Sequence, residues 1–293
     1  MKVLLLGSNG MLGQAVKKEL RSAGHTVKET DRSNADYCFD LLNDDKLFQS
    51  VQETNPDVII NTAAAVSLEY CENHPGDAYC LNSRLPGVLA DICREQGCYA
   101  VHISTDHFYY GDGRYLHSET DPVRLVNEYA RTKYAGEIFA MTYPQTLVLR
   151  TNIVGFRCRG QQTFVEWALD EAQKKQQMTL FTDFYTSSIH TADFAKVLLD
   201  LMENKITGIY NLGARTASSK KEFILKLSEQ LLGFIPDYIE KSVRQLKGVP
   251  RGDSLGLDTE RIEKTVGYRM PSLDETIESL KKEYTERKLY NEL

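Results

Sequence analysis

The stretch that decides the fold is VLLLGSNGMLGQAV, residues 3–16. Four apolar residues lead into Gly7, Gly10 and Gly13, and a helical segment follows. Glycine at these points permits a tight turn, close approach of the backbone to a pyrophosphate, and close packing of helix against strand. The N-terminus of the helix would direct free N–H groups at the phosphates. The spacing and its context therefore predict a dinucleotide-binding loop rather than a plain structural turn.

The rest of the first half continues this alternation of short apolar strands and amphipathic helices. We expect strands at 3–7, 25–31, 57–65 and 98–106, with helices at 13–24, 44–55 and 83–97. Continuous apolar strands separated by helices predict a parallel sheet buried on both faces. The expected fold class is α/β, with a Rossmann-type doubly wound parallel sheet and a smaller C-terminal α/β lobe.

The regular alternation of strands and helices ends after residue 150. Helices are expected at 164–176, 220–233 and 272–288, with a strand at 208–213. We assign residues 1–155 to an NAD(P)-binding Rossmann domain and expect segments near 182–214 to return to it. Residues 156–293 are expected to form mainly a substrate-binding lobe.

Composition excludes several classes of protein. The net charge of −6 argues against a general binder of nucleic acid or membrane surfaces. No apolar run reaches the length of a membrane span, and the run before Gly7 is too short for a signal-peptide core. The six cysteines form no CxxC pair, and the six histidines match no common metal pattern. We expect a soluble, cytoplasmic protein without a structural metal.

The choice of cofactor depends on the end of the second strand. Asp31 stands where a carboxylate commonly bonds the adenosine ribose, although a strand-end turn residue is the alternative. Arg32 follows and could instead meet a 2′-phosphate. The two residues favour NADH and NADPH respectively, so both cofactors stay open.

Two further segments are expected beside the cofactor. Asp40 and Leu41 stand near the adenine position. Ala63, Ala64 and Ala65 end a strand, and their small side chains would let a dinucleotide lie against the backbone. Tight packing explains an alanine run equally well.

Proton transfer is predicted in NEYARTKYAGE, residues 127–137. Tyr129 and Lys133 are four residues apart, so a helix places them on one face. A nearby lysine stabilises a phenolate, and such a tyrosine can protonate a carbonyl oxygen as hydride reaches its carbon. Ser104 and Thr105 end a strand, where open α/β sheets bind ligands, and can orient the carbonyl.

Taken together, the motifs resemble those of extended short-chain dehydrogenases/reductases, and most of all the dTDP-4-dehydrorhamnose reductase family. The resemblance covers nearly the whole chain, through GSNGMLG, DVIINTAAA, CENHPGDAYCLN, STDHFYYGDG, YARTKYAGE, VLRTNIVGF and PRGDSLGLD. It implies NAD(P)H-dependent reduction of the 4-keto group of a nucleotide-linked deoxysugar.

The resemblance also implies a set of site residues. Tyr129 would be the acid, Lys133 its partner and a cofactor ligand, and Thr105 the hydroxyl that orients the carbonyl. The cofactor would be lined by Gly7, Asn9, Gly10, Met11, Leu12, Gly13, Ala63, Ala64, Ala65, Asn82 and Ser104, and the substrate by Thr105, Asp106, His107, Asn152 and Arg251.

This chain departs from its relatives near the sugar. Related dehydratases carry glutamate after the aspartate, whereas here His107 follows Asp106. The absence of this glutamate disfavours dehydration. The reductases commonly carry tyrosine at the same position. We interpret His107 as wall or support rather than catalyst. Ile153 replaces a frequent tryptophan, and Ser188 with Ile189 replaces a usual proline–threonine pair, so the pocket could take a different sugar or nucleotide.

The substrate diphosphate needs local cations in an acidic chain. Candidates are Arg150, Arg157, Arg159 and Arg251, of which Arg251 is the first choice, with a surface arginine as an equal alternative. Alternatives to the reductase are an epimerase or dehydrogenase of sugar nucleotides, and a non-catalytic NAD(P)-binding regulatory subunit. A homodimer is possible, and no nucleic-acid or membrane partner is expected.

Overall fold

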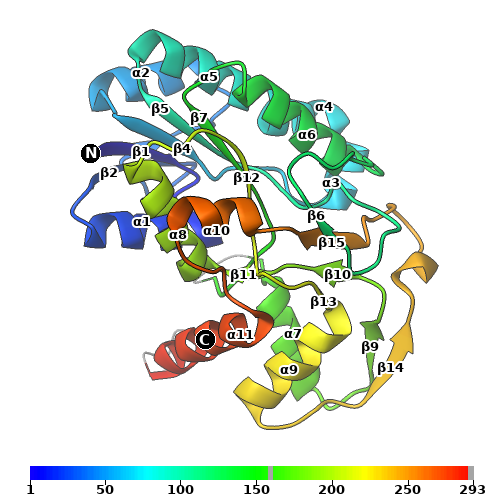
Figure 1. Ribbon diagram of the computed structural model, residues 1–293. Helices are drawn as coiled ribbons and strands as arrows, with labels where there is room; N and C mark the ends of the chain where they lie inside the picture. Colours follow the sequence, from blue (N-terminus) through cyan, green and yellow to red (C-terminus); the bar gives the residue numbers. More distant parts are fainter. Residues whose placement is uncertain (158–160, 290–293) are drawn as a thin grey trace. The chain divides into compact units, whose positions relative to one another are not determined.

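Two compact units make up the chain in this computed structural model, which describes residues 1–157 and 161–289 (Figure 1). The first unit contains Met1–His107, Leu125–Arg150 and Ala195–Tyr210, and the second contains Phe108–Arg124, Thr151–Phe194 and Asn211–Leu293. The first unit is therefore built from three segments of the chain, the last of them within the region 182–214 that was expected to return to it. Phe108–Arg124 differs most from the expected division, because it carries a strand that pairs with a late strand of the second unit.

A seven-stranded sheet forms the centre of the first unit. In spatial order its strands are β12 (Gly208–Leu212), β7 (Thr146–Thr151), β5 (Tyr99–Ile103), β4 (Val58–Asn61), β1 (Lys2–Leu6), β2 (Thr26–Asp31) and β3 (Tyr37–Cys38). The pairs recorded from β7 to β3 are all parallel. The predicted doubly wound parallel sheet is confirmed, with the order reversing at β1.

Helices cover both faces of this sheet. Figure 1 shows α2 (Asp44–Thr54) and α5 (Leu85–Gln96) on one side, and α1 (Met11–Ser22) with α8 (Thr191–Glu203) on the other. Successive residues of a strand point to opposite faces. Leu4 and Leu6 accordingly join the apolar cluster under α2 and α5, together with Leu47 and Val51 of α2. All four are fully buried.

The carboxyl ends of the central strands share one edge of the sheet. Leu6 at the end of β1 is in register with Asn61 at the end of β4, and Asn61 with His102 of β5. The glycine loop, the alanine run and the Ser104–Thr105 pair therefore leave the sheet at this edge, where ligands bind in open α/β folds.

Helix α6 (Glu128–Ala140) packs against α5 and against a short π-helix, η1 (Cys80–Arg84), which follows α3 (Leu68–Asn73) and α4 (Pro75–Tyr79). Asn127 caps its first turn by accepting the N–H of Ala130 at 2.8 Å. A Cβ at Gly136 would lie 2.1 Å from the Asn82 carbonyl oxygen, so glycine allows α6 and η1 to meet closely.

None of the described helices is long and apolar enough to cross a bilayer.

The second unit is built from short strands and a helical layer. Its four-stranded sheet runs β13 (Ser218–Ser219), β10 (Tyr185–Thr186), β15 (Ser254–Leu257) and β6 (Leu116–His117), and separate pairs join β11 (Ile189–His190) to β8 (Ile153–Val154) and β14 (Tyr238–Lys241) to β9 (Met178–Phe181). The helices are α7 (Phe164–Gln173), α9 (Lys220–Leu232), α10 (Glu260–Val266) and α11 (Leu273–Leu289), with a 3-10 turn, η2 (Val243–Gln245). Capping boxes begin α7 at Thr163 and α9 at Ser219.

Candidate active site

The glycine loop has the geometry of a dinucleotide cradle. Gly7 has φ +79°, and a Cβ there would lie 2.9 Å from the Thr62 hydroxyl oxygen. A Cβ at Gly13 would lie only 2.2 Å from the Gly7 carbonyl oxygen, so α1 can approach β1 only with glycine at that position. Gly10, the N-cap of α1, supplies no side-chain acceptor to the first turn. The backbone N–H groups of Met11 and Leu12, in the first turn of α1, can therefore bind a phosphate.

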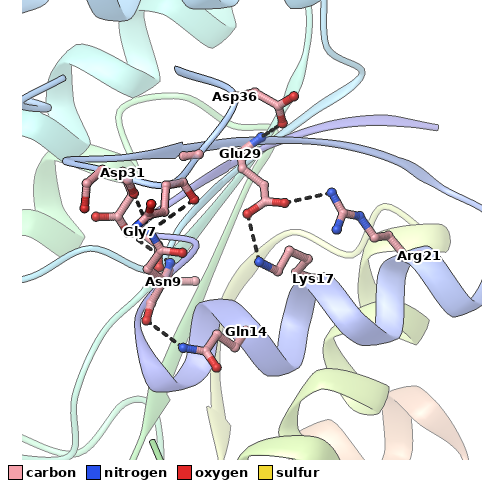
Figure 2. A network of polar contacts seen from close by, with 12 residues as sticks. Gly7, Asn9, Gln14, Lys17, Arg21, Glu29, Asp31 and Asp36 are labelled. Atoms are coloured by element: carbon pink, nitrogen blue, oxygen red, sulfur yellow. Dashed lines mark hydrogen bonds and ion pairs between the residues drawn. The ribbon is translucent and has the colours of Figure 1, made fainter. Parts of the chain in front are cut away.

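Asp31 is bound to the glycine loop itself (Figure 2). One carboxylate oxygen accepts the Asn9 N–H at 2.9 Å, and the other accepts the Arg32 N–H at 2.7 Å. The Asn9 side chain in turn donates to the carbonyl oxygen of Ser33 at 2.6 Å. The segment after β2 is therefore fastened to the glycine loop, and the Arg32 side chain is exposed beside it.

A second set of contacts in Figure 2 anchors α1 to the sheet. Lys17 and Arg21, one helical turn apart, reach the two carboxylate oxygens of Glu29 at 2.8 and 2.7 Å. The Glu29 N–H donates to Asp36 at 2.9 Å. These bonds set the position of the helix whose N-terminus forms the cradle.

The other expected cofactor positions fall into two groups. Asp40 accepts the Leu42 N–H at 3.0 Å in an exposed turn, and the Leu41 side chain is buried in the apolar cluster. Ala63, Ala64 and Ala65 follow β4 and are partly exposed. Asn82 is buried and binds Ala65 twice, accepting its N–H at 2.8 Å and donating to its carbonyl oxygen at 3.0 Å. Asn82 thus holds the alanine run in place.

The predicted catalytic residues converge at the end of β5. Tyr129 of α6 is 8% exposed, and the Thr105 hydroxyl lies near enough to its phenol to act on it. Burial raises the pKa of the Tyr129 phenol, the Thr105 hydroxyl lowers it and the Asp106 carboxylate raises it further, with a net rise. Lys133 is 1% exposed and donates to the Ile103 carbonyl oxygen at 2.7 Å. Burial lowers the pKa of the Lys133 ammonium to about 8.

His107 lies against Tyr129. The two rings meet edge to face, with their centroids 5.3 Å apart. The backbone N–H of His107 donates to the Thr105 hydroxyl oxygen at 3.3 Å. The ring nitrogen Nε2 of His107 lies 4.0 Å from the Asp106 carboxylate. His107 therefore forms one wall beside the Tyr129 ring and helps to hold Thr105.

A buried polar network that the sequence did not predict lies behind these residues. Glu137 of α6 accepts the Ser104 hydroxyl at 2.5 Å and pairs with Arg150 of β7 at 2.8 Å. Ser104 is thereby engaged within the protein, and Arg150, a candidate for the substrate diphosphate, is held in the interior at 3% exposure. A signal existed: Glu137 stands four residues after Lys133, as Lys133 does after Tyr129.

The remaining expected substrate residues lie in the second unit. The Asn152 side chain accepts the Ser188 hydroxyl at 2.7 Å, so Ser188 supports the strand pair β8–β11. Arg251 is partly buried in the segment before β15. Arg157 is described, with its N–H donating to Glu166 at 2.6 Å, whereas Arg159 and Cys158 lie outside the described residues.

Comparison with known proteins gives consistent matches. The family model described as the RmlD substrate binding domain matches residues 1–286. A probable low-salt glycan biosynthesis reductase of Haloferax volcanii is 26% identical, over 98% of this chain and 99% of that protein. A dTDP-4-dehydrorhamnose reductase of Salmonella typhimurium is 30% identical over 73% of each chain. A dTDP-4-dehydrorhamnose reductase of Bacillus anthracis, solved in complex with NADP, shares the fold with TM-score 0.86 and 23% identity, over 95% of this chain and 98% of that one.

Proposed function

This chain belongs to the family described as the RmlD substrate binding domain, and we propose that it reduces the 4-keto group of a nucleotide-linked deoxysugar with NADPH or NADH. The observation that carries the proposal is the meeting of Thr105, Tyr129 and Lys133 at the end of β5, beside a glycine cradle. The names of the relatives support the substrate class. The NADP in a related structure supports the cofactor class.

The glycine cradle fits the diphosphate of a dinucleotide. Gly7, Gly10, Met11, Leu12 and Gly13 would bind the pyrophosphate through backbone N–H groups and the positive end of α1. A bound nicotinamide in its reduced form supplies the hydride. The bonds from Asn82 to Ala65 would fix the adjoining wall of the cofactor site.

Tyr129 would donate the proton to the substrate carbonyl oxygen. Because burial and the Asp106 charge raise the pKa of its phenol, the group stays protonated at neutral pH and is ready to act as an acid. The Thr105 hydroxyl is a neighbour of the phenol, so a carbonyl oxygen placed between the two could accept a hydrogen bond from each. Thr105 would thereby orient the carbonyl toward the acid.

Lys133 would stabilise the phenolate that forms. It lies one turn from Tyr129 on the same buried face of α6, where a positive charge interacts strongly because water is excluded. A pKa of about 8 keeps most of the ammonium charged at neutral pH. Its remaining N–H groups could also hold the nicotinamide ribose hydroxyls.

The test is a turnover assay with purified protein, NADPH or NADH, and a panel of nucleotide-linked 4-keto-6-deoxysugars. Loss of the absorbance of the reduced nicotinamide would identify cofactor and substrate together. Tight cofactor binding without turnover on any sugar would reject the reductase proposal and favour a binding subunit.

A further inference from the structure

One face of α6 contacts three consecutive residues at the end of β5. Lys133 donates to the carbonyl oxygen of Ile103 at 2.7 Å. Glu137 accepts the Ser104 hydroxyl at 2.5 Å. The Tyr129 phenol neighbours the Thr105 hydroxyl, which lowers its pKa. These helix residues are spaced by four and buried, so the alignment of helix and strand end depends on all three contacts.

Glu137 is the member of this set that has no part in the proposed proton transfer. Its carboxylate meets the Arg150 guanidinium through two nitrogens, with Nε at 3.0 Å from one oxygen and Nη2 at 2.8 Å from the other. Glu137 is 0% exposed and Arg150 3%. A bidentate pair of this kind holds both side chains in one geometry.

We propose that Glu137 is a positioning residue for the reduction. Through Ser104 it fixes the strand end that carries Thr105, and through its charge it keeps Lys133 cationic. Arg150 holds the carboxylate in place for both tasks. The inference rests on the proposed function, since the residues it positions are the proposed acid, its partner and the hydroxyl that orients the carbonyl.

The charge of Lys133 depends on its neighbours. Among the described residues, the charged or titratable groups that interact with its ammonium are Glu137, from its own helix, and His102, from β5. Burial and the Lys133 charge hold the pKa of His102 well below its usual range, so this imidazole is neutral and supplies no counter-charge. The Glu137 carboxylate acts in the other direction, because it raises the pKa of Lys133 against the effect of burial.

The placement of Ser104 links the ion pair to the proposed site. The Ser104 hydroxyl donates to the same oxygen of Glu137 that accepts Arg150 Nε. Ser104 directly precedes Thr105. A shift of about 1 Å at a positioned catalytic group can lower the rate about 100-fold.

The main test is Glu137→Gln in the full-length protein. We expect kcat to fall about 10- to 100-fold with KM for the sugar changed less than about twofold. The pH above which the rate falls should move down by about 1, because Lys133 loses the carboxylate that favours its charge. The pH dependence of NADPH affinity, measured by fluorescence titration without any sugar, should move by the same amount.

Two further variants keep the test decisive. Glu137→Gln leaves a buried guanidinium without its carboxylate and can fail to fold, whereas Glu137→Gln with Arg150→Met removes both charges. We expect the folded double variant to retain the lowered pH limit. Ser104→Ala keeps the ion pair, so it should lower kcat and leave the pH limit unchanged. Arg131→Gln, on the exposed side of α6, is the matched control and should change neither quantity.

A folded double variant with the wild-type kcat and the wild-type pH limit would overturn the inference. The NADPH titration separates this outcome from failure of the proposed function. If the wild-type protein reduces no sugar in the panel, the shift in the NADPH profile still tests whether Glu137 controls Lys133. If the wild-type protein is active and neither profile moves in Glu137→Gln, the function stands and the positioning role is rejected.

Discussion

The Tyr129 phenol and the Thr105 hydroxyl are neighbours inside the first unit, at the end of β5, where the hydroxyl lowers the pKa of the phenol against the effect of burial. Both side chains are almost fully buried. Tyr129 comes from α6 and Thr105 from the sheet edge, so in the proposed reaction a carbonyl oxygen bound there would meet an acid and an orienting hydroxyl at once.

Replacing the proposed acid gives the first prediction. Tyr129→Phe keeps the ring against His107 and removes only the hydroxyl. We expect kcat to fall about 100- to 10,000-fold, the usual contribution of general acid catalysis. Cofactor affinity, measured by fluorescence titration, should stay within about threefold, because the ring and Lys133 remain.

Tyr134→Phe is the control for this change, since it removes a phenol from another position of the same helix. Its rate should equal that of the wild type. A Tyr129→Phe variant with near-normal kcat would show that another group supplies the proton.

The second prediction concerns pH. The pKa of Lys133 is lowered to about 8 by burial, whereas that of Tyr129 is raised, so the first proton lost on raising the pH comes from the lysine. We expect kcat/KM to decrease as the pH rises through about 8, because this parameter reports groups of the free enzyme. Lys133→Met should lower the rate at every pH and remove this limb; a limb that persists in the variant belongs to another group.

The free energy of unfolding should also depend on the titration of Lys133. It should rise with pH over the range in which kcat/KM falls. The folded pKa of Lys133, about 8, lies below its ordinary value of 10.5, so between these values the unfolded chain binds more protons. The free energy of unfolding therefore gains a contribution that rises with pH across this window and is absent below it. Urea unfolding at pH 7.5, 9 and 10.5 measures the total, and its difference from Lys133→Met isolates the lysine.

The third prediction concerns the choice between NADPH and NADH. Both oxygens of Asp31 accept backbone N–H groups, from Asn9 and Arg32, which assigns the carboxylate to the loop. The exposed Arg32 side chain, which follows Asp31 directly, is the residue that we expect to meet a 2′-phosphate. Arg32→Gln should weaken NADPH about 10- to 100-fold and leave NADH unchanged, as expected for a charged hydrogen bond.

Two comparisons complete this experiment. Lys18→Gln removes an exposed cation from α1 and should affect neither cofactor. Asp31→Ala should weaken both cofactors alike, because it loosens the glycine loop. If Asp31→Ala weakens NADH and strengthens NADPH, the carboxylate acts on the ribose instead of the loop.

The parts of the site that could be predicted are those determined by neighbours in the chain. The glycine loop follows its strand directly, and Tyr129 and Lys133 are one helical turn apart, so local spacing was sufficient. Thr105 was predictable because strand ends of a parallel sheet share one edge.

The remainder depends on contacts between distant segments. The amide of Asn82, a residue expected beside the cofactor, binds Ala65, 17 residues away, and the sequence did not indicate this contact. Arg150 was one of four candidates for the substrate diphosphate, and its pairing with Glu137 was not identified from local spacing. The two-residue strand β6 gave no periodic signal, so its pairing with β15, and the unit that contains it, could not be inferred.

The fourth prediction tests the glycine cradle without reference to any substrate. In Gly13→Ala the new Cβ would lie 2.2 Å from the Gly7 carbonyl oxygen, so α1 must move away from β1. We expect a loss of about 1–3 kcal/mol in the free energy of unfolding from overpacking, and at least tenfold weaker NADPH binding. Gly76→Ala, in α4, is the matched control, because its Cβ would meet nothing within 4 Å. Equal NADPH affinity in the two variants would mean that close approach of α1 to β1 does not form the cofactor site.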